Sequence, residues 1–137
     1  MLIDTSGFLC LYERSEPFHA NAVELYDQTS FRLTTNYILA EYTALAQARG
    51  IEREKIIDFS IGVLADESIE IVWIDAATHI AAVQLLSERA DKNYSLCDAA
   101  SFCVMRRRDM TEALTTDKHF EQEGFTRLLR KNGRPSR

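Results

Sequence analysis

Four acidic residues are candidates for chemistry because each lies among apolar or small neighbours. They are Asp4, Glu41, Asp98 and Asp117. Carboxylates brought together repel each other and destabilise a fold unless a cation neutralises them. Oxygen ligands without cysteine or convergent histidine favour a hard ion, Mg²⁺ or Mn²⁺, over zinc. Such an ion lowers the pKa of bound water and stabilises charge on a phosphate, which is the chemistry of phosphodiester hydrolysis.

Three of these acids also have a structural explanation when each is considered alone. Asp4 and Asp117 follow expected strands and precede expected helices, where an aspartate commonly caps the helix. Asp98 lies in an expected first helical turn, where a carboxylate faces the positive end of the helix dipole. If all the acids only cap an unrelated α/β fold, divalent metal will not stabilise the protein.

Helical spacing makes two of the acids harder to explain as solvated charges. Glu41 falls in a stripe with Ile38 and Tyr42, beside the expected core. Asp98 has Phe102 four residues further along its helix, on the same face. A carboxylate beside a core needs a partner, and a metal ion is one.

The elements that must position these acids follow from periodicity, since short β-like runs alternate with helical patterns. Such alternation predicts a parallel sheet covered by helices. The expected strands are Leu2–Ile3, Phe31–Thr34, Glu70–Ile74, Ala113–Thr115 and Thr126–Leu129. The expected helices are Ser6–Glu13, Pro17–Gln28, Tyr37–Arg49, Glu52–Ala65, Ala76–Ala90, Cys97–Arg108 and Lys118–Glu123. Sites in open α/β sheets gather beyond the carboxyl ends of the strands, so we expect all four acids at one end of the sheet.

Local signals support several of these boundaries. Pro17 suits the first turn of a helix, and Gly50 follows a helix expected to end at Arg49. Ser95 stands three residues before Asp98, like an N-cap with an acid in the first turn. The aromatic residues of the regular elements are expected to pack in the core rather than to stack on bases; these are Trp73, Tyr37, Tyr42, Phe59 and Phe102. Neither His19 nor His79 lies near an acidic motif.

Composition narrows the class of protein. The 137 residues and the 46% hydrophobic share fit one folded domain. A net charge of −5 argues against binding nucleic acid through a broad basic face. Acids that hold metal lower the net charge, however, while creating a site that phosphates approach through bound cations. Net charge alone therefore does not exclude a nucleic acid substrate.

The cysteines and the N-terminal residues indicate the cellular compartment. Cys10, Cys97 and Cys103 form an odd count without a CxxC pair, which is typical of core or helix residues in a reducing cytoplasm. The first residues lack the basic segment and long apolar run of a signal peptide, and no apolar stretch approaches bilayer length. We expect a cytoplasmic protein without a membrane segment.

Four segments together closely resemble the successive acidic motifs of PIN-domain nucleases, which include the VapC-type toxins of toxin–antitoxin pairs. The segments are LIDTSGF, LAEYTAL, YSLCDAASF and LTTDKHFEQEGF, and they span the chain from Leu2 to Phe125. No single segment is specific, but their order and spacing match. The resemblance implies a three-layer α/β fold with a central parallel sheet of four to five strands flanked by helices. It further implies one nuclease domain over residues 1–129, followed by a basic tail over 130–137.

The same resemblance implies a function and assigns residues to it. Asp4, Glu41, Asp98 and Asp117 take the family's four metal-binding positions, and the ion is Mg²⁺ or Mn²⁺. Ser6 and Thr116 match small hydroxyl positions that support the metal shell, although turn formation explains them equally well. The implied activity is that of an endoribonuclease toxin, with an RNA substrate, an antitoxin partner that blocks the acids with a basic side chain, and a homodimeric assembly.

Basic residues near the motifs are candidates for RNA phosphate contacts. One group flanks the acidic segments: Lys92, Arg106, Arg107, Arg108, Lys118 and His119. A second group lies toward the C-terminus: Arg127, Arg130, Lys131, Arg134 and Arg137. Arginines at a helix end also complement the helix dipole as a solvated cluster, so both explanations stay open for Arg106–Arg108.

Three other functions are weighed against a nuclease. A phosphatase of the haloacid-dehalogenase type would form a phosphoaspartyl intermediate on Asp4 and would need a second aspartate where Ser6 stands. A receiver-like signalling domain would need adjacent acids near the first strand. A catalytically idle PIN-like module that binds RNA or protein remains the main alternative, and loss of one of the four acids would have favoured it.

Overall fold

The central sheet has five parallel strands in the spatial order β3-β2-β1-β4-β5. The structure is a computed structural model that describes residues 1–131. The strands are β1 (Leu2–Ile3), β2 (Leu33–Thr35), β3 (Glu70–Val72), β4 (Glu112–Leu114) and β5 (Thr126–Arg127). The predicted parallel sheet and α/β class are therefore confirmed, although β3 and β5 are shorter than expected.

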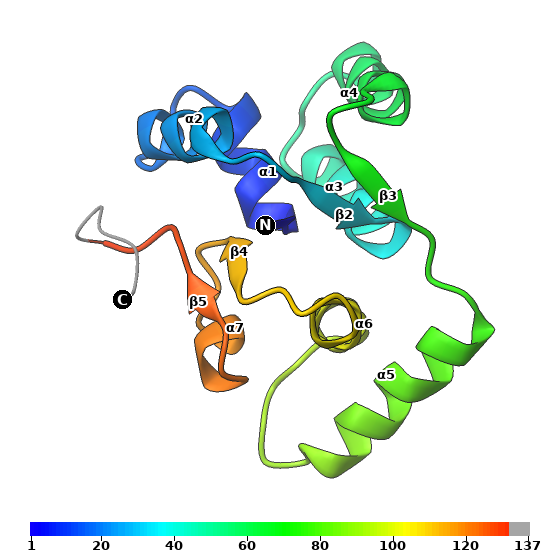
Figure 1. Ribbon diagram of the computed structural model, residues 1–137. Coiled ribbons are helices and arrows are strands. Elements are labelled where there is room, and N and C mark those ends of the chain that lie inside the picture. The colour runs from blue at the N-terminus through cyan, green and yellow to red at the C-terminus, as the bar shows by residue number, and fades with distance from the viewer. Residues whose placement is uncertain (132–137) are drawn as a thin grey trace.

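Seven helices flank this sheet within residues 1–131 (Figure 1). They are α1 (Thr5–Tyr12), α2 (His19–Gln28), α3 (Asn36–Ala48), α4 (Arg53–Ala65), α5 (Ala76–Glu88), α6 (Leu96–Arg107) and α7 (Lys118–Gln122). Gly50 has φ +79 directly after the C-cap of α3, as its position predicts. The expectation for Pro17 was wrong, because this residue lies in a turn and α2 begins only at His19, whose N–H donates to the carbonyl of Glu16 at 3.0 Å.

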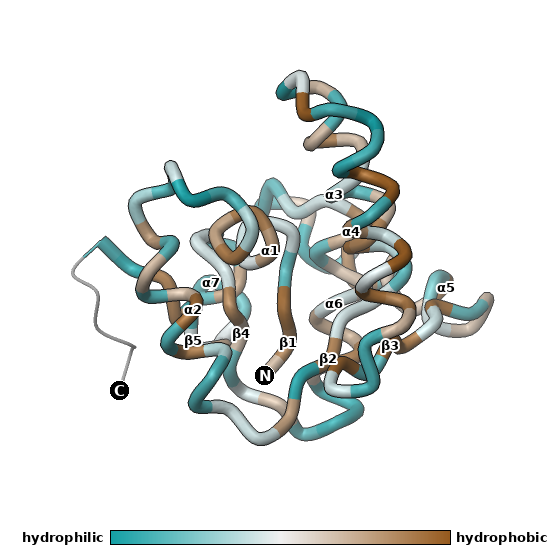
Figure 2. Tube along the Cα trace, turned by 90° about the horizontal axis from the view of Figure 1, so that it is seen from above, coloured by the Kyte–Doolittle hydropathy of each residue, from teal (hydrophilic) through white to brown (hydrophobic). Residues whose placement is uncertain are grey.

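Buried apolar side chains hold the sheet and its helices together. Leu2, Ile3 and Leu114 of the inner strands are fully buried, as expected for a parallel sheet covered on both faces. Phe8 of α1 packs edge-on against Tyr42 and Phe59, with ring centroids 6.1 and 5.3 Å away. Figure 2 shows hydrophobic, brown segments along β1 and β4 and helices that mix brown and teal.

Trp73 departs from the predicted core. Its side chain is 63% exposed, because β3 ends at Val72 and the tryptophan follows the last hydrogen-bonded residue of an edge strand. Local composition marked the segment as strand up to Ile74. Because pairing with β2 ends at Val72, Trp73 is not held in the sheet.

The strand order reverses between β1 and β4. The chain adds β2 and β3 on one side of β1 and then returns to place β4 on the other side. Leu2 pairs with Ala113 and Ile3 with Leu114, so Asp4 and Thr115 are the first residues beyond the two paired ends. A crevice at such a point is the usual binding site of an open α/β sheet.

Gly7 allows α1 to approach this point closely. A Cβ atom added at Gly7 would lie 2.1 Å from the carbonyl oxygen of Leu114, the last residue of β4. No side chain fits at that distance from backbone. The glycine of the segment LIDTSGF therefore sets the separation between α1 and β4.

Two predictions concern parts of the chain away from the site. Within residues 1–131, every helix is too short or too polar to cross a membrane. Of the predicted basic tail over 130–137, the residues Arg134 and Arg137 lie outside the described part of the chain. Arg127 instead belongs to β5, where it donates to the carbonyl of Thr116 at 3.0 Å.

Candidate active site

Asp4 is the most buried acid of the predicted set. It occupies the N-cap position of α1 without the usual capping hydrogen bond, and its carboxylate accepts a hydrogen bond from Thr115 Oγ1 across the sheet, at 2.9 Å. Only 4% of the residue is exposed. Burial, together with the charges of Asp98 and Glu41, raises the pKa of Asp4 to about 7, although hydrogen bonds from the Thr5 backbone and the Thr115 side chain oppose this. A simple capping role does not explain this carboxylate.

Hydroxyl groups tie Asp4 to the end of β4. Ser6 Oγ lies 3.1 Å from Thr115 Oγ1 and accepts the N–H of Thr116 at 2.9 Å. Thr115 Oγ1 also accepts the N–H of Asp117 at 3.0 Å. Ser6 therefore lies where the sequence predicts a supporting hydroxyl. The structure differs from the prediction for Thr116. The side chain of the neighbouring Thr115 contacts Asp4, whereas Thr116 donates its backbone N–H to Ser6.

Glu41 lies at the rim of the site rather than beside the core. It is exposed, whereas Ile38 and Tyr42 of the same helix are buried. The expectation that Glu41 lies beside the core was wrong. Glu41 is three residues after Ile38, which places it about 60° around the helix from Ile38, at the edge of the apolar stripe. Thr5 Oγ1 donates a hydrogen bond to Glu41 Oε1 at 2.5 Å and so fixes the carboxylate toward the end of β1.

Asp98 is buried at the N-terminus of α6. It forms a capping box with Ser95, in which Asp98 Oδ2 accepts the N–H of Ser95 and Ser95 Oγ accepts the N–H of Asp98, both at 3.0 Å. The predicted cap at Ser95 is therefore confirmed, and so is the buried stripe that continues through Phe102. Burial, with the negative charge of Glu41 next, raises the pKa of the neighbouring Cys97 thiol well above its usual value.

His119 joins two of the acids. Its Nδ1 atom lies 2.9 Å from Asp98 Oδ2 and 3.4 Å from Asp117 Oδ1. Asp117 also caps α7 by accepting the N–H of His119 at 2.9 Å. From the sequence His119 is only one of several flanking basic residues. The segment Asp-Lys-His directly after a strand is the sequence signal that could have singled out His119 as a partner of these acids.

A cavity of about 510 Å³ opens beside these residues. Asp4, Glu41 and Asp117 line it, together with Glu16 and Arg49. Arg49 is the C-cap residue of α3 and forms an ion pair with Glu16 at 3.0 Å. The structure therefore gives the acidic crevice a cation that does not belong to the predicted groups.

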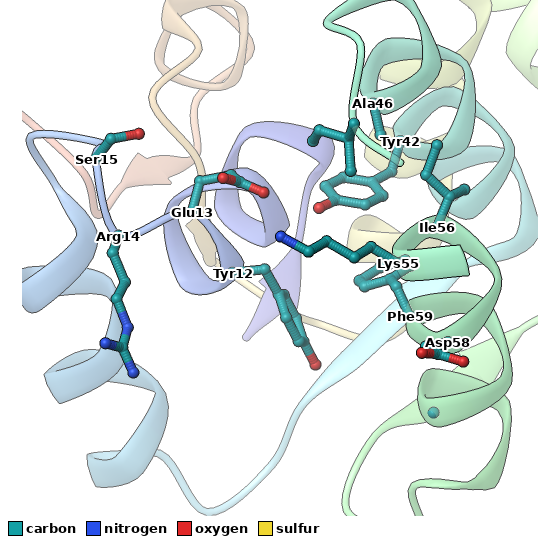
Figure 3. A pocket seen from close by; sticks show the side chains of 12 residues that line it. Tyr12, Glu13, Arg14, Ser15, Tyr42, Ala46, Lys55, Ile56, Asp58 and Phe59 are labelled. Carbon is teal, nitrogen blue, oxygen red and sulfur yellow. The ribbon is translucent and has the colours of Figure 1, made fainter. Parts of the chain in front are cut away.

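A larger cavity of about 680 Å³ lies next to the acidic crevice, between α1, α3 and α4 (Figure 3). Tyr42 and Phe59 form its apolar wall, and Lys55 reaches across it toward Glu13. The turn between α1 and α2 contributes residues to both cavities, and so does α3.

The predicted arginines of α6 lie away from the acids. Asp98 is at the start of α6 and Arg107 nine residues later, which is roughly 13 Å along the helix axis. Arg106 contacts Glu123 at 2.5 Å, Arg107 donates to Thr78 Oγ1 at 3.0 Å, and Arg108 pairs with Glu70. The structure engages all three in contacts within the chain and does not bring them to the site.

The other predicted cations lie closer in the chain to the acids. Lys92 is in the loop before α6 and pairs with Asp91 at 3.4 Å, which leaves both side chains partly exposed. Lys118 is the first residue of α7, directly after Asp117, and is exposed. Surface pairs such as Lys92–Asp91 are weak, so they do not prevent a contact with a phosphate.

The donor set fits a hard divalent ion. Asp4, Asp98 and Asp117 come from the ends of β1 and β4 and the start of α6, and Glu41 comes from α3. Asp4, Glu41 and Asp117 line one cavity, whereas Asp98 and Asp117 hold their carboxylate oxygens close to His119. Carboxylate oxygens are the ligands that Mg²⁺ and Mn²⁺ prefer. Burial above all, with the charges of Asp98 and Glu41, raises the pKa of Asp4, and a cation at this place would lower it again.

Comparison with known proteins adds to this geometry. The family model described as PIN domain matches residues 1–125 of the 137-residue chain. The chain belongs to the PIN-domain family. The matched range includes all four acids of this PIN domain, and also Ser6, Thr115 and His119. The resemblance carried by the four acidic segments is therefore confirmed at the level of the family.

Individual relatives of this PIN domain come from Mycobacterium tuberculosis. Ribonuclease VapC26 of strain H37Rv is 29% identical over 123 residues, which cover 88% of this chain and 89% of the relative. The 23S rRNA-specific endonuclease VapC20 is 26% identical over 129 residues, covering 93% and 97%. The crystal structure of VapC20, described as a sarcin–ricin loop cleaving toxin, superposes with a TM-score of 0.81 over 90% of this chain and 95% of that one, at 26% identity.

Proposed function

We propose that this PIN domain is an endoribonuclease that hydrolyses RNA phosphodiester bonds, and that it is the toxin of a toxin–antitoxin pair. Asp4, Glu41, Asp98 and Asp117 are the proposed catalytic residues and hold Mg²⁺ or Mn²⁺. The observation that carries the proposal is the buried carboxylate of Asp4 at the strand-order reversal, with its pKa raised to about 7. A cation beside such a group would favour its anionic form and offset the cost of its burial.

Several residues of the chain would orient the carboxylates that take part in such a reaction. A divalent ion, when bound, supplies an activated water and neutralises charge on the scissile phosphate. Thr115 orients Asp4 and Thr5 orients Glu41, each through a hydrogen bond to a carboxylate oxygen. The capping box fixes Asp98 at the start of α6. Because these contacts lock the donors before substrate arrives, the site is preorganised.

Arg49, Lys118 and Lys92 are the proposed contacts for the RNA backbone. Arg49 lines the crevice and is half exposed, and its ion pair with Glu16 is of the weak surface kind. A phosphate entering the crevice would replace Glu16 as the partner of the guanidinium. Lys118 follows a proposed metal ligand directly, so an RNA strand at the site passes within its reach.

An antitoxin is the proposed protein partner. Carboxylates gathered in one crevice attract a basic side chain, and its insertion would block the metal positions. The neighbouring cavity, with its apolar wall of Tyr42 and Phe59, gives such a partner an anchor beside the crevice (Figure 3). A small protein that inhibits cleavage should therefore lose affinity for Lys55→Glu, at an exposed residue of the same cavity, while this variant still cuts RNA in its absence.

A homodimer is the proposed assembly. The outer side of α5 exposes two large apolar side chains one helical turn apart: Ile80 is 67% exposed and Val83 49%. α5 lies outside α6, at the periphery of the molecule (Figure 1). Exposed apolar residues that are continuous mark protein contact surfaces. Ile80→Glu should give a monomer in analytical ultracentrifugation. Ile61→Glu on α4, at a similarly exposed isoleucine, should leave the dimer intact.

The central experiment is cleavage of RNA by the purified chain with Mg²⁺, with Mn²⁺ and with chelator. The substrates are a mixed cellular RNA pool and an oligonucleotide of the sarcin–ricin loop, because the similar protein VapC20 is described as cleaving that loop. Metal-dependent cutting that is absent in Asp98→Asn is the expected result. Cutting that persists in chelator or in Asp98→Asn would reject the assignment of the acids. Binding without cutting of any substrate would favour the idle PIN-like module.

A further inference from the structure

His119 is placed like a third ligand beside two of the proposed metal-binding acids. Its Nδ1 atom lies 2.9 Å from Asp98 Oδ2 and 3.4 Å from Asp117 Oδ1. One donor atom from each of the three residues lies within 4.8 Å of the other two. Donor atoms separated in this way can all reach one ion placed among them, since metal–ligand bonds are 2.0–2.6 Å long.

The ring of His119 is held in this position by the fold. Its backbone N–H donates to Asp117 Oδ1 at 2.9 Å, which sets the residue in the first turn of α7. The Tyr94 ring packs against the imidazole with centroids 5.3 Å apart. The hydroxyl of Tyr94 donates to the buried Glu123 at 3.0 Å, so the packing partner is itself fixed. The imidazole therefore faces the two carboxylates without needing to be ordered by a ligand.

We propose that His119 is a nitrogen ligand of the divalent ion bound between Asp98 and Asp117, and that it makes the site select Mn²⁺ over Mg²⁺. This rests on the proposed metal-dependent function and deepens it. Mg²⁺ takes oxygen donors in near-ideal octahedra and keeps much of its water. Imidazole nitrogen is a softer donor that binds first-row transition ions more readily. A mixed set of two carboxylates and one imidazole therefore favours Mn²⁺, whereas a purely acidic set would leave the choice to ion abundance.

The competing explanation is that His119 only orients Asp98 through a hydrogen bond. In that case the ion would contact carboxylates and water alone, and its identity would not depend on the imidazole. The two explanations differ in whether a histidine nitrogen is bonded to the metal, which is measurable apart from RNA cleavage.

The experiment is pulsed electron paramagnetic resonance of Mn²⁺ bound to the full chain, with calorimetric titration of Mn²⁺ and Mg²⁺. His119→Phe keeps a ring against Tyr94 and removes the nitrogen. His79→Phe is the matched control, because His79 bonds to the Tyr37 hydroxyl on the α5 side of the molecule. His119→Gln provides a second variant should the phenylalanine disturb folding, which circular dichroism will reveal.

The expected result is ¹⁴N modulation of the Mn²⁺ echo in the wild type, changed to the ¹⁵N pattern by ¹⁵N-histidine labelling. His119→Phe should abolish it and reduce Mn²⁺ affinity about tenfold or more, with Mg²⁺ affinity changed far less. Nitrogen modulation that survives in both His119 variants, or an unchanged ratio of Mn²⁺ to Mg²⁺ affinity, overturns the proposal while leaving the acidic site in place. If the wild type binds neither ion, the proposed metal-dependent function fails with it.

Discussion

The hydroxyl of Thr115 lies 2.9 Å from Asp4 Oδ2, so the first residue after β4 holds the first residue after β1. The two residues are 111 positions apart in sequence and meet because β1 and β4 are neighbours in register. The same hydroxyl accepts the N–H of Asp117. One side chain thus connects two proposed metal ligands.

Replacing Thr115 by valine should reduce cleavage without unfolding the protein. Valine keeps the shape of the side chain but leaves Asp4 and the Asp117 N–H without this partner. Loss of a group that orients a metal ligand typically lowers activity by about ten- to a hundredfold. We expect kcat/KM and Mn²⁺ affinity to fall in Thr115→Val and to recover in Thr115→Ser. Thr116→Val is the control, since Thr116 acts through its backbone; an equal loss there would contradict the role given to Thr115.

Replacing Asp4 by asparagine should make metal-free protein more stable at alkaline pH. The pKa of Asp4 is about 7 in the folded chain against 3.8 for the free group, so the folded state binds the proton more tightly. Its contribution to stability is complete below pH 4 and is lost as the pH rises toward 7. Urea unfolding in chelator should show a larger gain for Asp4→Asn at pH 8 than at pH 5. An equal gain at both values would contradict the raised pKa.

Asp98→Asn is expected to behave differently in the same unfolding experiment. Asp98 is part of a capping box, and weakening a helix cap costs about 1 kcal/mol. This variant should therefore lose cleavage and also lose some stability, at pH 5 as at pH 8. If Asp98→Asn instead gained stability, as Asp4→Asn is expected to, repulsion between the carboxylates would outweigh the loss of the cap of α6.

Gly7→Ala should destabilise the whole fold. The added methyl group would meet the carbonyl of Leu114 at 2.1 Å, and backbone on both sides must move to relieve the overlap. Overpacking of this kind costs about 3 kcal/mol. Thermal unfolding measures the effect, with Gly62→Ala in α4 as the control because nothing lies within 4 Å of its added Cβ. Equal melting temperatures for the two variants would show that the fold does not depend on the close approach of α1 to β4.

Arg49→Ala should weaken binding of every RNA and reduce its dependence on salt. If the guanidinium contacts one phosphate of a single strand, the slope of log affinity against log salt should fall by about 0.7. Binding is measured in the Asp98→Asn background so that the RNA is not cut. Arg14→Ala serves as the control, because this exposed arginine lines the neighbouring cavity instead. An unchanged slope in Arg49→Ala would remove this residue from the RNA path.

Local patterns in the chain are sufficient to predict the alternation of strands and helices and the position of acids at strand ends. Periodicity and capping residues are local, so Ser95 and Gly50 mark their helix ends without reference to the rest of the chain. The four acidic segments were also sufficient to indicate the family, since their order along the chain is a property of the sequence. These features depend on neighbours a few residues away.

Contacts between distant segments select the side chains that meet at the site. The register of β1 against β4 selects Thr115 as the partner of Asp4, and the rotation of α3 places Glu41 at the rim. The packing of α7 against α6 brings His119 to Asp98, 21 residues earlier, and turns Arg106 toward Glu123 instead of the crevice. Register, rotation and docking are set by contacts between distant segments, and periodicity within one segment carries no information about them.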